Sequence, residues 1–238
     1  MLEILGIVAP VFLCAAVGYG WIRLGRPYDR DMITRLITDV GAPCLVFSGL
    51  IALDSRSAQL TTIVGAALIA MTCFAALGFA VLRTARLPSH TFLPPLVFGN
   101  TGNMGLPLCL FAFGDEGLSL AVCFFATVAI THYSLGVWVW SGRVSVVELL
   151  RTPLFYGTLF GVAVLVEDVA VPVWLRNTTQ LLGGFTIQLM MITMGVSLAE
   201  LRLHGLPRTV ALSILRLGMG VAVGFALSAV LEIGRAHV

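Results

Sequence analysis

The chain has 238 residues, of which 58% are hydrophobic and only 11% are charged, and its mean hydropathy is +1.00. A soluble domain carries about 25% charged residues, so this composition excludes an ordinary water-soluble enzyme. It also excludes a disordered chain, which needs low hydrophobicity, and a disulfide scaffold, which needs a short cysteine-rich chain. The sequence therefore predicts an integral membrane protein.

Eight apolar segments follow one another along the chain, and each approaches the roughly 20 residues that a membrane helix needs. We expect these spans at Leu2–Ile22, Leu36–Leu53, Ala58–Leu82, Phe92–Gly114, Leu118–Trp140, Leu149–Val166, Asn177–Leu198 and Thr209–Leu231. The segments are continuously apolar and show no two-residue alternation, which disfavours a β-barrel. The predicted fold class is an all-α membrane protein with no sizeable soluble domain.

The charged loops predict an orientation, because all fourteen basic residues are arginine and they are unevenly spread. Counted from the N-terminus, the even-numbered loops hold only Arg56 and Arg176. The odd-numbered loops hold ten: Arg23, Arg26, Arg30, Arg35, Arg83, Arg86, Arg143, Arg151, Arg202 and Arg208. The positive-inside rule then places the N-terminus outside. We expect a multi-pass protein of the plasma membrane. The arginines form no clustered basic face, so we expect no nucleic-acid partner.

The fourth segment differs from the others in composition. Pro94, Pro95 and Pro107 flank the run Gly99-Asn100-Thr101-Gly102-Asn103-Met104-Gly105. Proline removes a backbone donor and glycine tolerates non-helical dihedrals, so we expect a broken helix here. Free backbone groups at membrane depth must line a cavity or be buried in protein, and such a break points to a transporter's substrate site. The alternative is a hydrophilic turn that joins two short helices outside the bilayer.

The polar groups of this run are the candidate substrate ligands. The amides of Asn100 and Asn103 would hold the unwound backbone and contact a substrate carboxylate, with the Thr101 hydroxyl as a further donor. Gly102 would permit the bend. The second half-helix would open at Gly105 and Pro107, where its N-terminal dipole favours an anion.

Three ionisable residues inside other spans are candidates for ion coupling or charge balance. Asp39 could take up a proton, although a carboxylate at a helix N-terminus near the interface has the same pattern. Arg216 could neutralise Asp39 or attract substrate, or its side chain could extend to the interface. His132 could relay protons, or could be a hydrogen-bonded packing residue. The five cysteines include no CxxC pair and no histidine lies at metal spacing, so no metal or cofactor is expected.

The run Asn100-Thr101-Gly102-Asn103-Met104-Gly105-Leu106-Pro107 resembles the Asn-x-Gly-Asn…Leu-Pro motif of the auxin efflux carrier family of membrane transporters. Other segments are similar to the first, second and seventh helices of that family: Pro10-Val11-Phe12, Ala42-Pro43-Cys44-Leu45-Val46-Phe47 and Gly195-Val196-Ser197-Leu198-Ala199. The resemblance covers nearly the whole chain.

This resemblance implies a ten-helix carrier built from two inverted five-helix repeats, whose broken fourth and ninth helices cross at the substrate site. Residues 1–140 would form the first repeat and residues 141–231 would form three helices of the second, so that the ninth and tenth helices are absent. The last six residues resemble the translated read-through of a sequencing adapter, and we expect 232–238 to be non-native.

The function expected from these observations is secondary transport of a small organic anion, such as a dicarboxylate or an auxin-like carboxylate, across the lipid bilayer. Protons or sodium ions would be coupled to the transport of the anion. The protein could also form a homodimer. A channel or a non-transporting membrane subunit is the alternative. An enzyme is not expected, because the chain has no GxSxG or HExxH motif and no pair of intramembrane aspartates.

Overall fold

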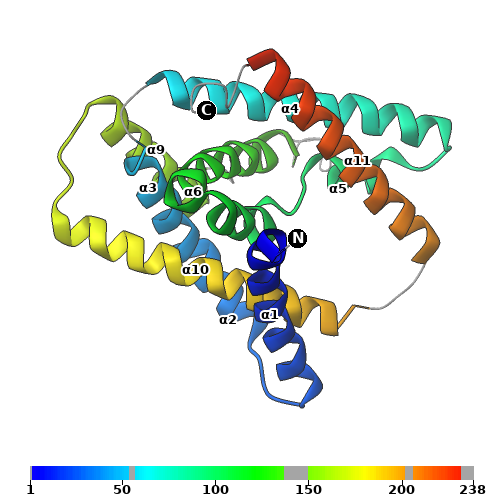
Figure 1. Ribbon diagram of the computed structural model, residues 1–238, viewed down its shortest axis with the longest axis horizontal. Coiled ribbons are helices and arrows are strands. Elements are labelled where there is room, and N and C mark those ends of the chain that lie inside the picture. The colour runs from blue at the N-terminus through cyan, green and yellow to red at the C-terminus, as the bar shows by residue number, and fades with distance from the viewer. Residues whose placement is uncertain (1, 54–56, 137–149, 202–205, 232–238) are drawn as a thin grey trace.

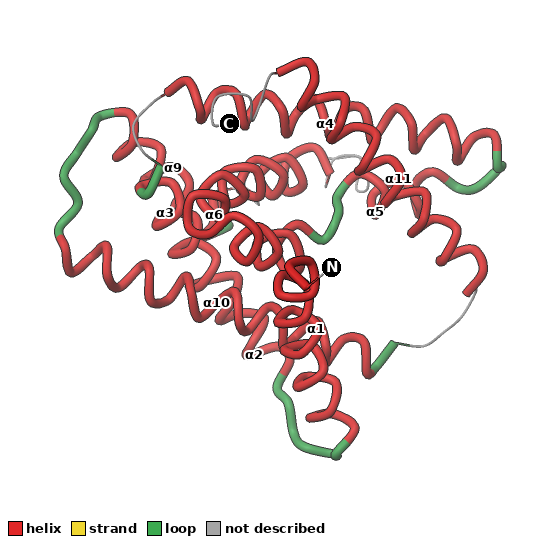
Figure 2. The backbone as a smooth tube through the Cα atoms, in the orientation of Figure 1, coloured by secondary structure: helices red, strands yellow, loops and turns green. Residues whose placement is uncertain are grey.

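The computed structural model describes residues 2–53, 57–136, 150–201 and 206–231, and all regular structure within these ranges is helical (Figures 1 and 2). The expected non-native tail 232–238 lies outside the described residues. The α-helices are α1 (Leu2–Arg23), α2 (Arg30–Arg35), α3 (Ala42–Ile51), α4 (Ser57–Thr84), α5 (Ser89–Val97), α6 (Leu106–Thr131), α9 (Pro153–Val166), α10 (Val173–Ala199) and α11 (Leu206–Leu231). Three π-helical turns adjoin these helices. The first, η1 (Leu36–Gly41), lies between α2 and α3; η2 (Thr101–Gly105) precedes α6, and η3 (His132–Gly136) follows it.

Six helical runs in the described ranges are long and apolar enough to cross a membrane. They correspond to the expected spans, with two differences. The expected fourth and fifth spans lie in one run, Ser89–Ser134, and the expected sixth span contains α9, a shorter apolar helix of 14 residues. The total of eight spans and the inverted repeat therefore stay predictions.

The run Ser89–Ser134 is too long for a single straight crossing. At 1.5 Å per residue its 46 residues would extend about 70 Å, against about 30 Å for the hydrocarbon core. Two irregularities divide it: the chain leaves helical geometry at Phe98, and Gly114 has φ +68° and ψ −157° inside α6. A positive φ suits glycine, which has no Cβ to clash. The run thus has the length and the bends for two crossings.

The helices pack as two groups. One group contains α1, α3, α9 and α10, and the other contains α4, α5, α6 and α11; α6 also packs against α3 and α1, and lies in the middle of the molecule (Figure 1). Glycines set the close crossings of the first group, because a Cβ at Gly195 would overlap the Ala15 carbonyl and one at Gly157 would lie 2.6 Å from the Pro43 carbonyl oxygen. Small residues of this kind let membrane helices approach closely.

Large apolar side chains cover the outer surface. Phe113 is 73% exposed, Leu217 is 71% exposed and Phe225 is 73% exposed, while the core between the helices is also apolar, with Val46 and Val122 fully buried. Such extensive exposed apolar surface is rare in water-soluble monomers. The outside of this bundle suits a hydrocarbon environment.

Candidate functional site

The helical backbone of the fourth segment is interrupted between α5 and η2. Phe98 has φ −91° and ψ 91°, and Asn100 has φ −77° and ψ 61°. The last bond of α5 runs from the Phe98 N–H to the Pro94 carbonyl (2.8 Å), and the Thr101 N–H then donates to the Gly99 carbonyl (2.8 Å). The chain therefore has a non-helical segment of three residues, 98–100, with a tight turn at Asn100, before it re-enters a helix at Thr101.

Two prolines explain the π-helical turns η1 and η2. Pro43 lies in the first turn of α3, directly after η1, and Pro107 lies in the first turn of α6, directly after η2. A proline has no N–H, and its ring clashes with the carbonyl four residues earlier, so a regular α-helical turn is disfavoured there. In each case the chain takes a wider turn with i to i−5 bonds, from Ala42 to Ile37 and from Leu106 to Thr101.

Residues of all three π-helical turns line one cavity of about 740 Å³. It is lined by residues of η1, by 98–103 of the broken segment, by the C-terminal part of α6 and η3, by Arg151 to Leu154 at the start of α9, and by Met190 of α10. Single π-helical turns within α-helices are frequent at functional sites, because the extra residue redirects side chains. Three such turns around one cavity mark it as the candidate site.

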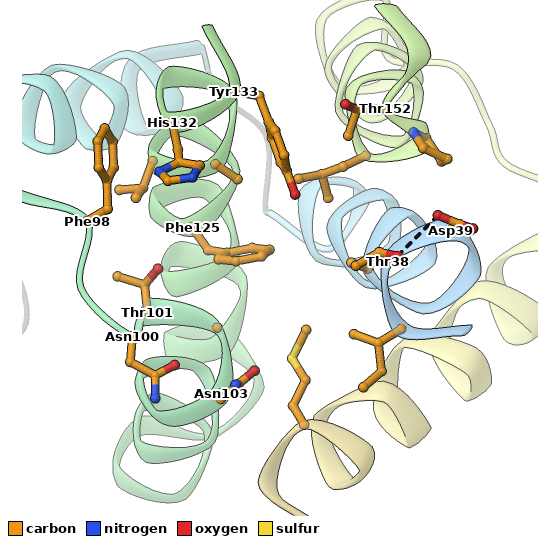
Figure 3. Close-up of a pocket in the computed structure, with 18 of the residues that line it drawn as sticks. Thr38, Asp39, Phe98, Asn100, Thr101, Asn103, Phe125, His132, Tyr133 and Thr152 are labelled. Carbon is orange, nitrogen blue, oxygen red and sulfur yellow. Dashed lines mark hydrogen bonds between the residues drawn. The ribbon is translucent and has the colours of Figure 1, made fainter. Parts of the chain in front are cut away.

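Six of the nine sequence-predicted site residues line this cavity: Asn100, Thr101, Gly102, Asn103, Asp39 and His132. Figure 3 shows Asn103 and Phe125 on one wall, with Thr38 and Asp39 on the opposite wall. The fold thus brings a second-span carboxylate, the broken fourth segment and a fifth-span histidine together around one space.

The two asparagine amides have different surroundings. Asn100 is exposed, and its Nδ2 donates to Met194 Sδ at 3.8 Å, a weak contact with α10. Asn103 is half-buried, and within the described part of the chain its amide makes no hydrogen bond. Asn103 therefore offers two donors and one acceptor to whatever occupies the cavity. Gly102 is buried, and a Cβ there would lie 3.1 Å from the Phe125 ring.

Aromatic rings surround His132. Its ring meets Phe98 edge-on, with centroids 4.5 Å apart, and Tyr133 at 5.7 Å. Its Nδ1 is buried and has no hydrogen-bond partner among the described residues, so the interpretation as a hydrogen-bonded packing histidine finds no support at this nitrogen. Asp39, across the cavity, is exposed and accepts a bond of 3.1 Å from the Thr38 hydroxyl.

The remaining three predicted residues lie outside the lining. Gly105 faces a separate apolar cavity beside α4, and Pro107 is buried in the first turn of α6. Arg216 lies in the middle of α11 with its guanidinium over the Phe74 ring, 4.0 Å from the centroid to Cζ. The ion pair formed within the described ranges joins Arg30 and Glu200, so Arg216 does not pair with Asp39 there.

Sequence reasoning missed several lining residues, which are Thr38, Phe98, Tyr133, Arg151 and Thr152. Arg151 counted only as a loop charge, and no local pattern distinguished it from the other loop arginines. The position of Thr38 next to Asp39 was the available signal, because a hydroxyl beside a membrane carboxylate can bond to it.

A second cavity of about 490 Å³ lies at the other ends of the same elements. Its lining includes Ser48 of α3, Asp115 and Ser119 of α6, and Gln180 and Gln188 of α10. The two cavities share no lining residue, and buried apolar side chains such as Leu45, Val122 and Ile187 belong to the core of these helices. Two cavities with polar side chains in their linings therefore border α3, α6 and α10, one beside the start of α3 and one beside the rest of this helix.

Comparison with known families shows which family the chain belongs to. The family model described as membrane transport protein matches residues 3–143, more than half of the chain. The chain belongs to this family of membrane transport proteins. The match confirms the auxin efflux carrier resemblance and includes the broken segment and the first-half residues of the cavity. A comparison with curated proteins finds no match.

As a membrane transport protein, the molecule is a multi-pass membrane protein whose apolar outer surface contacts lipid. The half-exposed polar groups of the cavity then lie inside a bundle whose outside is apolar. Ionisable groups in this position cost free energy in a membrane, so they are rare there and mark substrate or ion pathways.

Proposed function

We propose that the protein is a secondary carrier that binds a small organic anion, such as a dicarboxylate or an auxin-like carboxylate, in the cavity beside the broken fourth segment. The observation that carries this proposal is the convergence of three π-helical turns and an interrupted helix on one cavity with polar lining residues, in a member of a transporter family. Transporters place their substrates at discontinuous helices of this kind.

The chemistry of the lining favours a carboxylate. The Asn103 amide has free donors, and the first turn of a helix has backbone N–H groups without intrahelical acceptors, here those of η2. The Thr101 hydroxyl lies on the same turn. These donors can bond to carboxylate oxygens without a full negative charge opposing them on that wall of the cavity.

The two cavities support transport over simple binding. A carrier must accept its substrate from both sides of the membrane, and separate cavities with polar lining residues border the two ends of α3. In the proposed orientation the N-terminus is outside. The larger cavity then faces the cytoplasm, because Arg151 at its edge belongs to an arginine-rich cytoplasmic loop.

Asp39 and His132 are the groups in this cavity that can exchange a proton, and we propose them as the coupling residues. Both lie on the cavity wall but on different elements, so a proton and an anion would share one space. Sodium as coupling ion is the competing version of this proposal, with the Asp39 carboxylate as its oxygen ligand.

The proposal is tested by binding. The 238-residue chain is purified in lipid nanodiscs, and the binding of radiolabelled malonate and indole-3-acetate is measured by equilibrium methods. Saturable binding of one of these anions that unlabelled anion displaces would support the proposal. Lack of saturable binding of either anion by a chain that elutes as a folded species would overturn it.

Ion flux separates the carrier from the channel alternative. A carrier saturates with substrate and does not conduct, whereas a channel passes ions through a continuous pore. Conductance steps in planar bilayers that contain the purified chain would favour the channel and would contradict the carrier.

A further inference from the structure

Arg216 is a cation in the middle of an apolar helix. Its guanidinium stacks on the Phe74 ring, a side chain that is only 7% exposed within a core cluster of α4, α5 and α11. Its Nε is buried and has no hydrogen-bond partner among the described residues. The residue as a whole is half-buried, and partly buried charges are screened less than those of a surface arginine, so its electrostatic effect reaches farther.

Gly99 connects this cation to the cavity. A Cβ built on Gly99 would lie 2.8 Å from Arg216 Nη2 and 3.4 Å from Cζ, so the guanidinium occupies the space that a side chain would need. Gly99 also lines the cavity of Asn103, whereas Arg216 does not. The non-helical backbone of the broken segment therefore separates the guanidinium from the cavity at this point, with no side chain between.

The charged side chains of the cavity lining explain why the position of Arg216 affects the charge balance of the cavity. In the described part of the chain, the lining contains one aspartate, Asp39, and one arginine, Arg151, whose side chains have opposite charge types. The described ion pair, Arg30 with Glu200, lies elsewhere and leaves the charge of Arg216 uncompensated. Arg216 therefore tips the charge balance of the cavity region toward positive.

We infer that Arg216 determines the charge specificity of the cavity: it favours anionic over neutral substrates by acting through the backbone at Gly99. This inference rests on the proposed function and specifies it further. The residue is not a direct ligand in this arrangement. Its effect should therefore scale with substrate charge and should be absent for a neutral molecule of the same shape.

Matched substrate pairs test the inference on the whole chain in nanodiscs. Malonate is compared with malonamide, and indole-3-acetate with indole-3-acetamide, so that each pair differs in charge and hardly in size. For each variant the ratio of anion to amide affinity is measured by competition. We expect Arg216→Gln to lower this ratio at least tenfold, while the affinity for the amide changes little. Arg216→Lys, which keeps the charge, should preserve most of the ratio.

Two further variants separate the charge from the fold. Gly99→Ala keeps every charge but forces the guanidinium away from the broken segment, and it should lower the ratio as well; Gly218→Ala, with open space around its Cβ, should not. Arg208→Gln removes an exposed arginine of the same helix and should leave the ratio unchanged.

The outcomes are distinguishable. If the unaltered chain binds neither anion, the proposed function itself is overturned. If it binds an anion and Arg216→Gln keeps the unaltered ratio, the inference alone is wrong. A loss of affinity for anion and amide in equal proportion would also overturn the inference, because it indicates a packing role only.

Discussion

Asp39 and Asn103 occupy equivalent positions in two separate π-helical turns, each four residues before a proline. The local sequences are Asp39-Val40-Gly41-Ala42-Pro43 and Asn103-Met104-Gly105-Leu106-Pro107, so both follow the pattern Asp/Asn-x-Gly-x-Pro. In each, the proline disfavours the regular bond to the carbonyl four residues earlier. Gly41 also lets Thr186 of α10 approach, whereas a Cβ at Gly105 would make only ordinary contacts with Thr101 and Asn100. Both polar side chains reach the same cavity from opposite walls (Figure 3).

The first prediction concerns the proline of the second turn. In Pro107→Ala, residue 107 regains an N–H that can bond to the Asn103 carbonyl, which favours a regular α-turn over η2. Losing one residue from the turn rotates the preceding residues by about 100°, since an α-helix has 3.6 residues per turn. We expect anion affinity to fall at least tenfold without a lower thermal unfolding temperature.

The control for this variant is Pro10→Ala, which removes a proline from the interior of α1, away from the cavity lining. It should leave anion affinity unchanged. If Pro107→Ala binds like the unaltered chain, the wider turn is not what orients Asn103.

The second prediction concerns the Asn103 amide. A hydrogen bond to a charged ligand group is worth about 1.5–3 kcal/mol, which corresponds to roughly 10- to 150-fold in affinity. Asn103→Ala should therefore weaken anion binding at least tenfold in an equilibrium binding assay, while the chain inserts and purifies normally.

Asn177→Ala is the matched control, because Asn177 is an exposed asparagine of α10 that does not line the cavity. Leu96, one turn from the motif, is unsuitable, because it is buried at 2% exposure and its truncation would disturb the core. Equal affinity of Asn103→Ala and the unaltered chain would place the substrate elsewhere.

The third prediction concerns the charge of Asp39. The Asp39 carboxylate lines the same cavity as the proposed anion site, and two negative charges in one space repel each other. Asp39→Asn removes this charge and keeps the size of the side chain. It should therefore bind an anion more tightly than the unaltered chain at neutral pH.

The comparison uses one monocarboxylate at a single pH, and His132→Gln, which changes the other proposed coupling residue of the cavity, is measured in parallel. If Asp39→Asn binds the anion no more tightly than the unaltered chain, the Asp39 carboxylate does not oppose the substrate.

The sequence predicted the all-helical class and the break, because both depend on local composition. Apolar segments must be helical in a membrane, and Pro94, Gly99 and Pro107 act on the backbone at their own positions. The same locality explains why four residues of the motif line one cavity, since 100–103 are adjacent in the chain.

The partners across the cavity could not be predicted in this way. Arg151 reaches the lining only because the start of α9 packs on α3. The place of Arg216 behind Gly99 likewise depends on how α11 lies across α4 and α5 (Figure 1). These are relations between elements far apart in sequence, and a single sequence contains no direct signal for them.

The fourth prediction concerns stability. A methyl group at Gly195 would overlap the Ala15 carbonyl on α1, so Gly195→Ala must push α1 and α10 apart. Overpacking of this kind costs about 1–3 kcal/mol. We expect a lower thermal unfolding temperature in detergent. Gly184→Ala in the same helix has open space around its Cβ and should leave the temperature unchanged or raise it slightly.

The fifth prediction concerns orientation. Ala85 lies between α4 and α5, in an arginine-rich loop, and Val169 lies between α9 and α10, in a loop with acidic residues; both are exposed. The positive-inside rule places Ala85 in the cytoplasm and Val169 outside. In a chain whose native cysteines are replaced, a membrane-impermeant maleimide should label Val169→Cys in intact cells and Ala85→Cys only after permeabilisation. Labelling of Ala85→Cys alone in intact cells would reverse the orientation, and the cavity beside the broken segment would then face outward.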